Sequence, residues 1–297
     1  MSLPRQILPG TTYLVTRRCA EQRFFLRPSR RSQEIFRYCL AVAAARTGVQ
    51  LHAFCVMSNH WHAVLSDPYA RLPEFMAYLH KYVAKALNGL LQRKENLWSS
   101  EPYHAVVLES RTEVLDKMVY VLANPVQARL VRRAAHWPGV HSAAMTSETV
   151  QRVSRPDWFF RPEGPMPAEA VLQLTLPPQV DSTNPATFWQ ELQARVRERE
   201  LQCEQDKGPK VLGIVRILRL SPFQGPKMLQ RRWSNRLAIA GKTKQVQERV
   251  RKRLKEFHHH YREAYLAFRQ GIRETLFPAG TYLLRVQLQV HCEPAAG

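Results

Sequence analysis

The chain has 297 residues and a formal net charge of +20, so it is strongly basic. Hydrophobic residues make up 45% of the chain, which is enough to bury a sizeable core and excludes wholesale disorder. Because there is neither a run of eighteen apolar residues nor a signal peptide, we expect a cytoplasmic, nucleoid-associated protein without a membrane partner. Both halves of the chain are basic, and this favours nucleic acid as the polyanion that they contact.

The first half of the chain predicts an α+β unit. The apolar periodicity predicts one helix over Arg31–Thr47, ended by Gly48, and a second helix over Leu72–Arg93. Pro73 suits the first turn of that second helix. Between the two helices, strand-like segments flank the turn residues Ser58-Asn59.

Two histidines separated by one residue, His60 and His62, follow this turn directly. Residues i and i+2 of a strand point to the same face, about 7 Å apart along the backbone. The two imidazoles can therefore converge on one cation, while Trp61 faces the other way into packing. An isolated His-x-His is more often a pair of unrelated histidines, so this pattern alone leaves the metal site as one of two interpretations.

A second candidate group lies sixty residues later. Ser110 and Glu113 have the spacing of a capping box, which predicts a helix from about Thr112. Tyr120 and Asn124 fall opposite the apolar stripe of that helix and, being four residues apart, share one face. The stripe consists of Val114, Leu115, Met118, Val119 and Leu122.

Pro125 is expected to end this helix at Asn124 and to leave the amide free to turn towards a ligand. The competing interpretation of Tyr120 is an ordinary surface tyrosine. Taken together, a phenol and a cation held by two imidazoles and an amide oxygen are suited to phosphoryl transfer.

These motifs resemble the single-tyrosine HUH transposases, specifically the REP-associated tyrosine transposases. The resemblance is carried by Phe54–His62 and by Tyr120–Val131, and it continues weakly into Trp137-Pro138 and Ser142. Thr12–Arg18 looks like the first strand of that family. The similarity covers roughly residues 10–145 and does not extend to the large C-terminal part.

The resemblance implies an α+β fold with a central antiparallel sheet flanked by helices. It also implies that Tyr120 is the nucleophile and that His60, His62 and Asn124 hold Mg²⁺ or Mn²⁺. Two imidazoles tolerate zinc as well, so the motif does not name the ion. The expected activity is cleavage and rejoining of single-stranded, hairpin or repeat DNA through a 5′-phosphotyrosine intermediate.

Two other functions remain possible on the sequence. A domesticated DNA-binding protein that acts on repeats without cutting would have no chemical need for all four site residues. A relaxase or replication initiator is disfavoured because a third motif histidine and a paired catalytic tyrosine are missing. The sequence leaves open whether the protein is a monomer or a homodimer.

Further residues are candidates for DNA contact or for the nucleophile. Tyr78 and Tyr82 rival Tyr120, but neither has an amide placed as Asn124 is. The predicted DNA-binding residues are basic and come from the first strand, the second helix and the C-terminal region, with solvated lysines as the alternative for the helix. They are Arg17, Arg18, Lys81, Lys85, Arg231, Arg232 and Arg236.

We predict three parts. Residues 1–150 form the catalytic domain, 151–186 a proline-rich connector, and 187–297 a basic, mostly helical region that binds DNA. Residues 207–255 carry fifteen Lys and Arg against one acidic residue, which argues against a solvated face of alternating charges. Leu283–Val290 is expected to be a final strand.

Overall fold

Four antiparallel strands form the central sheet of the computed structural model, which describes residues 4–181, 183–226 and 244–295. In spatial order the strands are β2 (Gln50–Val56), β3 (His60–Asp67), β1 (Thr11–Arg18) and β4 (His104–Leu108). The two inner strands, β3 and β1, are buried along most of their length. The predicted α+β fold with a central antiparallel sheet is confirmed.

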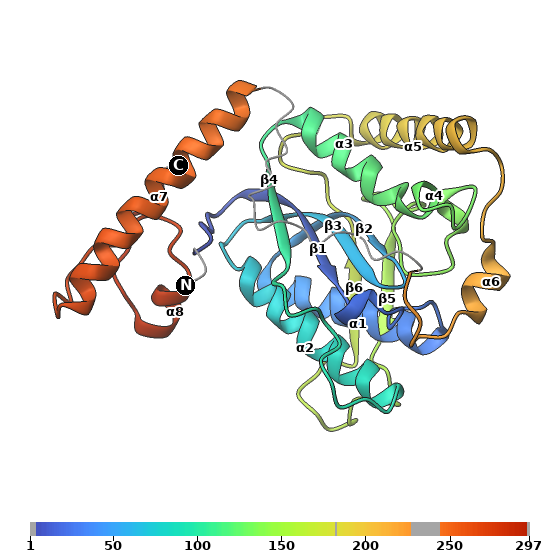
Figure 1. Ribbon diagram of the computed structural model, residues 1–297, viewed down its shortest axis with the longest axis horizontal. Helices are drawn as coiled ribbons and strands as arrows, with labels where there is room; N and C mark the ends of the chain where they lie inside the picture. The colour runs from blue at the N-terminus through green and yellow to red at the C-terminus, as the bar shows by residue number, and fades with distance from the viewer. Residues whose placement is uncertain (1–3, 182, 227–243, 296–297) are drawn as a thin grey trace.

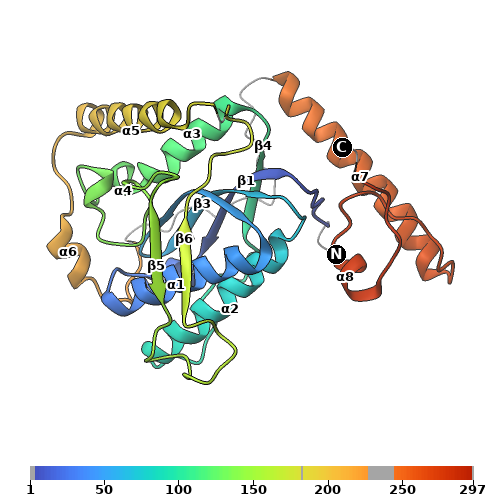
Figure 2. The same ribbon diagram turned by 180° about the vertical axis from the view of Figure 1, so that it is seen from behind.

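Helices cover both faces of this sheet (Figures 1 and 2). On one face, Trp61 of β3 packs against Phe36 of α1 (Arg30–Thr47) and donates a 3.2 Å hydrogen bond to His80 of α2 (Leu72–Leu90). On the other face, His62 of the same strand packs against Tyr120 of α3 (Arg111–Leu122). The alternation of a strand therefore sends the tryptophan into the core and the histidines towards α3.

Local sequence signals set the ends of these helices. Ser29 caps α1 by accepting a hydrogen bond from the backbone N–H of Ser32, and Gly48 ends that helix with φ at 73°, a conformation that favours glycine. Ser110 and Glu113 form the predicted capping box of α3. Because these signals act within a few residues, the helix ends agree closely with the sequence-based prediction.

The segment predicted as a proline-rich connector contains a β-hairpin, β5 (Val150–Ser154) paired with β6 (Glu169–Gln173). The hairpin covers the outer side of α1, and the indole N–H of Trp158 donates to Glu34 of that helix. Downstream of β6, the backbone N–H of Thr175 donates to Leu51 O at 2.8 Å. Residues 151–181 therefore belong to the folded body, and their prolines lie in the loops around the paired strands.

The helix α5 (Pro185–Lys207) lies along α3 and is joined to it by ion pairs, including one between Glu191 and Arg111. The chain then passes through α6 (Ile214–Arg219) and returns to the body, where Phe24 N donates to Gln224 O at 2.8 Å. Arg231, Arg232 and Arg236 lie outside the described residues, so their contact with DNA stays a prediction.

A C-terminal arm (residues 244–295) contains α7 (Lys244–Arg269) and α8 (Leu283–Leu288) and lies beside the N-terminal segment (Figure 1). The expectation of a final strand over Leu283–Val290 is wrong, because most of this stretch is helical. Its alternating apolar residues are typical of a strand, but a strand also needs a paired edge. Here the N–H of Val286 instead bonds to Tyr282 O at 3.0 Å within one helical turn.

Short helical turns complete the described chain: η1 (Ala20–Gln22), α4 (Asn124–Gln127) and η2 (Ala134–His136). None of the helices in the described ranges is both long and apolar enough to cross a membrane.

Candidate active site

The register of the central strands brings four side chains to one end of the sheet. His60 and His62 lie on β3, and their ring centroids are 4.6 Å apart. On the neighbouring strand β1, Thr16 lies opposite His62 and Arg18 lies opposite His60. Because directly paired residues of antiparallel strands point to the same face, both β1 side chains share the face of the histidine pair.

Each imidazole is fixed through its Nδ1 atom. Thr16 Oγ1 lies 2.7 Å from His62 Nδ1, and Asn59 Oδ1 lies 2.7 Å from His60 Nδ1. Asn59 is itself held, since its Nδ2 donates to Gln22 O at 3.1 Å. His62 Nε2 is buried and has no hydrogen-bond partner in the structure. A buried ring nitrogen without a partner is costly, so this atom is suited to accept a ligand.

Tyr120 approaches the histidines from α3. Its ring lies 5.4 Å from that of His62 in an edge-to-face arrangement. The first residue of α4, Asn124, is 9% exposed, and its side chain lies close enough to act on both neighbours, raising the pKa of His60 and lowering that of Tyr120. The predicted group of His60, His62, Tyr120 and Asn124 is therefore assembled in space.

Asn124 reaches the site by a different backbone path from the one predicted. The helix α3 ends at Leu122, and Ala123 caps it in the αR region. Asn124 then begins the short helix α4, with Pro125 next to it in the first turn. Proline is tolerated there because its missing N–H has no partner in a first turn. Pro125 thus opens a new helical turn, where the sequence predicted only an end.

Burial and a nearby guanidinium set the electrostatics of the site. Burial lowers the pKa of His60 to about 3, with a further decrease from Arg18 that the hydrogen bond with Asn124 opposes. Burial also lowers the pKa of His62 well below its usual value, assisted by His60 and Arg18. Both imidazoles are therefore neutral at pH 7, which is the form that binds metal ions.

The phenol of Tyr120 is subject to opposing effects. Burial raises its pKa, whereas the hydrogen bond with Asn124 and the charge of Arg18 lower it. Burial is the largest effect, so the pKa of Tyr120 stays above its usual value, and Asn124 and Arg18 offset part of the increase. Arg18 also places a positive charge where a phosphate would approach the tyrosine.

Of the other predicted DNA-binding residues, the three that the structure describes, Arg17, Lys81 and Lys85, lie away from this group. Arg17 points to the opposite face of β1 and donates to Ser99 O at 3.0 Å. Lys81 and Lys85 are exposed on α2, which covers the face opposite the histidines. Among these basic residues, only Arg18 is brought to the histidine pair.

The rival tyrosines also lie on α2. Tyr78 and Tyr82 stack against each other with centroids 4.7 Å apart, and the hydroxyl of Tyr78 bonds to the sulfur of Met166. Tyr82 packs against Phe160. Both rings are thus engaged with the β5–β6 region, on the other side of the sheet from His60 and His62.

Sequence reasoning missed the two residues that orient the imidazoles, Thr16 and Asn59. Asn59 could have been found, because it directly precedes His60 and its amide can reach the neighbouring ring. Thr16 gave no such signal, since its place opposite His62 depends on β1 pairing with β3.

The donors present fit one cation. The rings of His60 and His62 lie 4.6 Å apart, the Nε2 atom of His62 has no hydrogen-bond partner among the described residues, and the side chain of Asn124 lies beside His60. Among the described residues, no group of three or more His, Cys, Asp and Glu side chains could hold a metal ion. A mixed set of nitrogen and amide oxygen donors suits Mn²⁺ and zinc and is compatible with Mg²⁺ bound partly by water.

No family model matches the chain, and no curated protein matches it. The solved structures that are similar to it include the two that follow. One is a REP-associated tyrosine transposase bound to a REP hairpin, with 15% identity over 48% of this chain and 82% of that chain and a TM-score of 0.38. The other is a candidate transposase from Deinococcus radiodurans R1, with 18% identity over 39% of this chain and 93% of that chain and a TM-score of 0.29. Likeness at these scores does not establish a shared function.

Proposed function

We propose that the protein is a metal-dependent transesterase of single-stranded DNA, with the activity of a tyrosine transposase. The observation that carries the proposal is the convergence of Tyr120, Asn124, His60 and His62 at one end of the sheet. The buried Nε2 atom of His62, which has no hydrogen-bond partner among the described residues, supports a ligand at this place. DNA is the proposed partner because the chain carries a net charge of +20 and the site contains Arg18.

In the proposed reaction the oxygen of Tyr120 attacks the phosphorus of a DNA phosphodiester. The bond to the 3′-oxygen breaks, leaving a 5′-phosphotyrosine and a free 3′-hydroxyl. The proton lost by the phenol balances the proton gained by the 3′-oxygen. Because the phosphotyrosine conserves the energy of the phosphodiester, a 3′-hydroxyl from another strand can reverse the step and join DNA without ATP.

The chain's own residues have separate tasks in this scheme. Arg18 attracts the phosphate and favours the phenolate of Tyr120. Asn124 lies beside Tyr120 and acts to lower the pKa of the phenol, and Thr16 fixes the ring of His62. His60, His62 and Asn124 would hold a Mg²⁺ or Mn²⁺ ion, which when bound polarises the phosphodiester and stabilises negative charge. The proposed substrate is a hairpin or repeat with an unpaired foot.

The test is incubation of the protein with end-labelled hairpin DNA, followed by a denaturing gel. We expect a covalent protein–DNA adduct with Mg²⁺ or Mn²⁺ and none in chelator. His60→Ala and His62→Ala should abolish the adduct while DNA binding survives. His259→Ala, which changes an exposed histidine of α7, is the matched control and should leave the adduct unchanged.

Full adduct formation in chelator, or in either site variant, would contradict the metal-assisted mechanism. Binding of DNA without any adduct under all metal conditions would instead indicate a binding protein that does not cut.

A further inference from the structure

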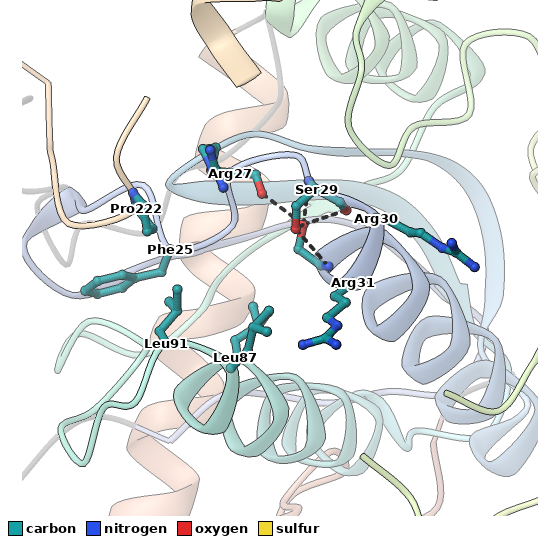
Figure 3. Close-up of a pocket in the computed structure, with 10 residues that line it drawn as sticks. Phe25, Arg27, Ser29, Arg30, Arg31, Leu87, Leu91 and Pro222 are labelled. Atoms are coloured by element: carbon teal, nitrogen blue, oxygen red, sulfur yellow. Dashed lines mark hydrogen bonds between the residues drawn. The ribbon is translucent and has the colours of Figure 1, made fainter. Parts of the chain in front are cut away.

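A cavity of about 420 Å³ lies at the end of the sheet that carries the histidine pair, between the start of α1 and the end of α2 (Figure 3). Its volume is within the range of small-molecule sites, roughly 300–1,000 Å³. The residues that line it are of two kinds. The apolar ones include Phe25, Leu87, Leu91 and Pro222, and the basic ones include Arg27 and Arg31.

Three arginines line the cavity, and among the described residues Arg27 and Arg31 are the two that form no ion pair with a carboxylate. Arg27 donates one hydrogen bond, to Leu218 O at 2.6 Å, and a guanidinium has five N–H groups in all. Arg31 is exposed, and its guanidinium lies 5.7 Å from the ring of Trp158. In Figure 3, Arg31 extends beside Leu87, whereas Arg30 points away from the cavity, in agreement with its 2.8 Å ion pair to Glu34.

The start of α1, which lies at this cavity, is capped by side chains. Ser29 and Ser32 cap the start of α1 reciprocally, which satisfies one backbone N–H on each of the two residues. The attraction for an anion thus comes from the guanidinium groups. A ligand suited to this cavity has a flat apolar part and a phosphate, and a nucleotide has both.

One loop joins the cavity to the candidate active site. Phe25 forms a wall of the cavity, and the next residue, Leu26, donates its N–H to Ser58 O at 2.9 Å. Four residues before Leu26, the carbonyl of Gln22 accepts the hydrogen bond from Asn59, the residue that orients His60. The cavity lies on the α1 and α2 side and the histidines on the α3 side, so this loop runs between them around the end of the sheet.

The chain beyond α6 completes the cavity. Pro222 lines it, and the backbone carbonyl of Gln224 holds Phe24 in place. Phe223 is 46% exposed and stands edge-to-face against Phe25, with ring centroids 6.4 Å apart. An exposed aromatic ring beside a basic cavity is a stacking surface of the kind that binds single strands.

We propose that this cavity receives one unpaired nucleotide of the DNA strand, with its base between Phe25 and Leu91 and its phosphate against Arg27 and Arg31. The inference rests on the proposed function, since the strand held here is the one that continues to Tyr120. The cavity would fix where along the unpaired foot the reactive phosphodiester lies.

The test uses hairpin oligonucleotides in which each nucleotide of the unpaired foot is replaced in turn by an abasic site. Affinity is measured in chelator, so that the result does not depend on cleavage. Because stacking of one base contributes about 1–3 kcal/mol, an abasic site at one position should weaken binding about tenfold, and the other positions should have smaller effects.

Two variants report on the cavity. Leu91→Trp fills it, so binding of the intact oligonucleotide should weaken about tenfold and the position-specific abasic effect should disappear. Leu201→Trp adds the same ring to the exposed face of α5 and should change neither. Arg31→Ala, at an exposed position that tolerates alanine, should lower the salt dependence of binding by about 0.7, whereas Arg152→Ala on the exposed face of β5 should not.

An unchanged abasic profile in Leu91→Trp, or equal effects at every foot position, would overturn the proposal. A free deoxynucleoside monophosphate has the same base and phosphate as one nucleotide of a strand, so it is the alternative ligand for this cavity. We expect them not to saturate the protein below millimolar concentration; tight binding of a free nucleotide that Leu91→Trp removes would show that the cavity serves a small molecule and not a strand.

Discussion

The folded body of the chain (residues 4–226, Ser182 not being described) and the C-terminal arm are held in different ways. The body has one continuous apolar core, in which Trp61, Phe36 and Leu65 are almost completely buried. The described part of the arm has a small core of its own, made of Ala264, Phe277 and Val290. Apolar burial is the dominant stabilising contribution in folding, so most of the stability resides in the body.

Polar contacts join the arm to the body. Arg249 and Arg253 of α7 both pair with Glu109, at 2.7 and 3.0 Å, and all three side chains are partly exposed to solvent. Backbone hydrogen bonds add to this attachment, including one from Ile7 N to Gly280 O at 3.0 Å. The candidate active site and the nucleotide cavity both lie within the body. Because the site lies in the apolar body and the arm is joined to it by polar contacts, we expect the proposed chemistry to depend on the body. Weakening the contacts of the arm should not disturb the site.

The largest expected effect is a loss of stability that affects the core of the body and not the core of the arm. Trp61→Ala should lower the free energy of unfolding of the body by about 3–5 kcal/mol, because it leaves a cavity beside Phe36 and His80. Phe277→Ala removes a fully buried ring from the arm and should leave the unfolding of the body unchanged. Urea unfolding followed by tryptophan fluorescence, together with hydrogen exchange in α7, measures both.

Equal destabilisation of the body by Phe277→Ala and by Trp61→Ala would contradict the view that the arm and the body have separate cores. In that case the arm and the body would unfold as one cooperative unit.

The next effect is a pH dependence that belongs to the body. His52 is completely buried between Thr175 O and the hydroxyl of Ser66, and burial lowers its pKa to about 4. In the unfolded chain its pKa is near 6.5, so between pH 6.5 and 4 the unfolded state binds a proton that the folded state does not. The contribution of His52 to stability is therefore complete above pH 6.5 and should fall by about 3 kcal/mol as the pH decreases to 4.

His52→Gln removes the titration and keeps groups that can form hydrogen bonds. Its free energy of unfolding should decline less than that of the unchanged protein over the same pH range. Parallel curves for the two proteins would show that His52 is not kept neutral by the fold.

Sequence reasoning succeeded where the signals were local. The capping box of Ser110 and Glu113 fixed the start of α3, and the two-residue period of a strand placed His60 and His62 on one face. The spacing of four residues brought Tyr120 and Asn124 together, although the helix breaks between them.

Contacts that depend on tertiary packing could not be predicted. Thr16 and Arg18 meet the histidines only because β1 lies between β3 and β4, an order that no local pattern encodes. The pairing of β5 with β6 inside a proline-rich stretch, and the return of Pro222 to the wall of the cavity, join residues that are far apart in sequence. The alternating residues after Leu283 favoured a strand, but in the structure Leu283–Leu288 form the helix α8.

The smallest expected effect concerns the attachment of the arm. Exposed ion pairs contribute about 0.2–1 kcal/mol each, and salt screens them. Glu109→Gln should therefore weaken the contact of α7 with the body by about 1 kcal/mol, and leave the remaining contact less sensitive to salt. Distances between spin labels on α7 and on α3, measured from low to high salt, report the change. Glu148→Gln, at an exposed position of the body, is the control, and an effect of equal size there would rule out a specific role of Glu109.

The central claim is that Tyr120, beside the histidine pair, is the group that becomes joined to DNA. Mass spectrometry of the covalent adduct, after digestion of protein and DNA, identifies the modified residue directly. The account predicts a phosphotyrosine at Tyr120 and no adduct in Tyr120→Phe, which loses one oxygen and keeps the ring that packs against His62. A phosphotyrosine at Tyr78 or Tyr82, or an adduct that persists in Tyr120→Phe, would contradict it.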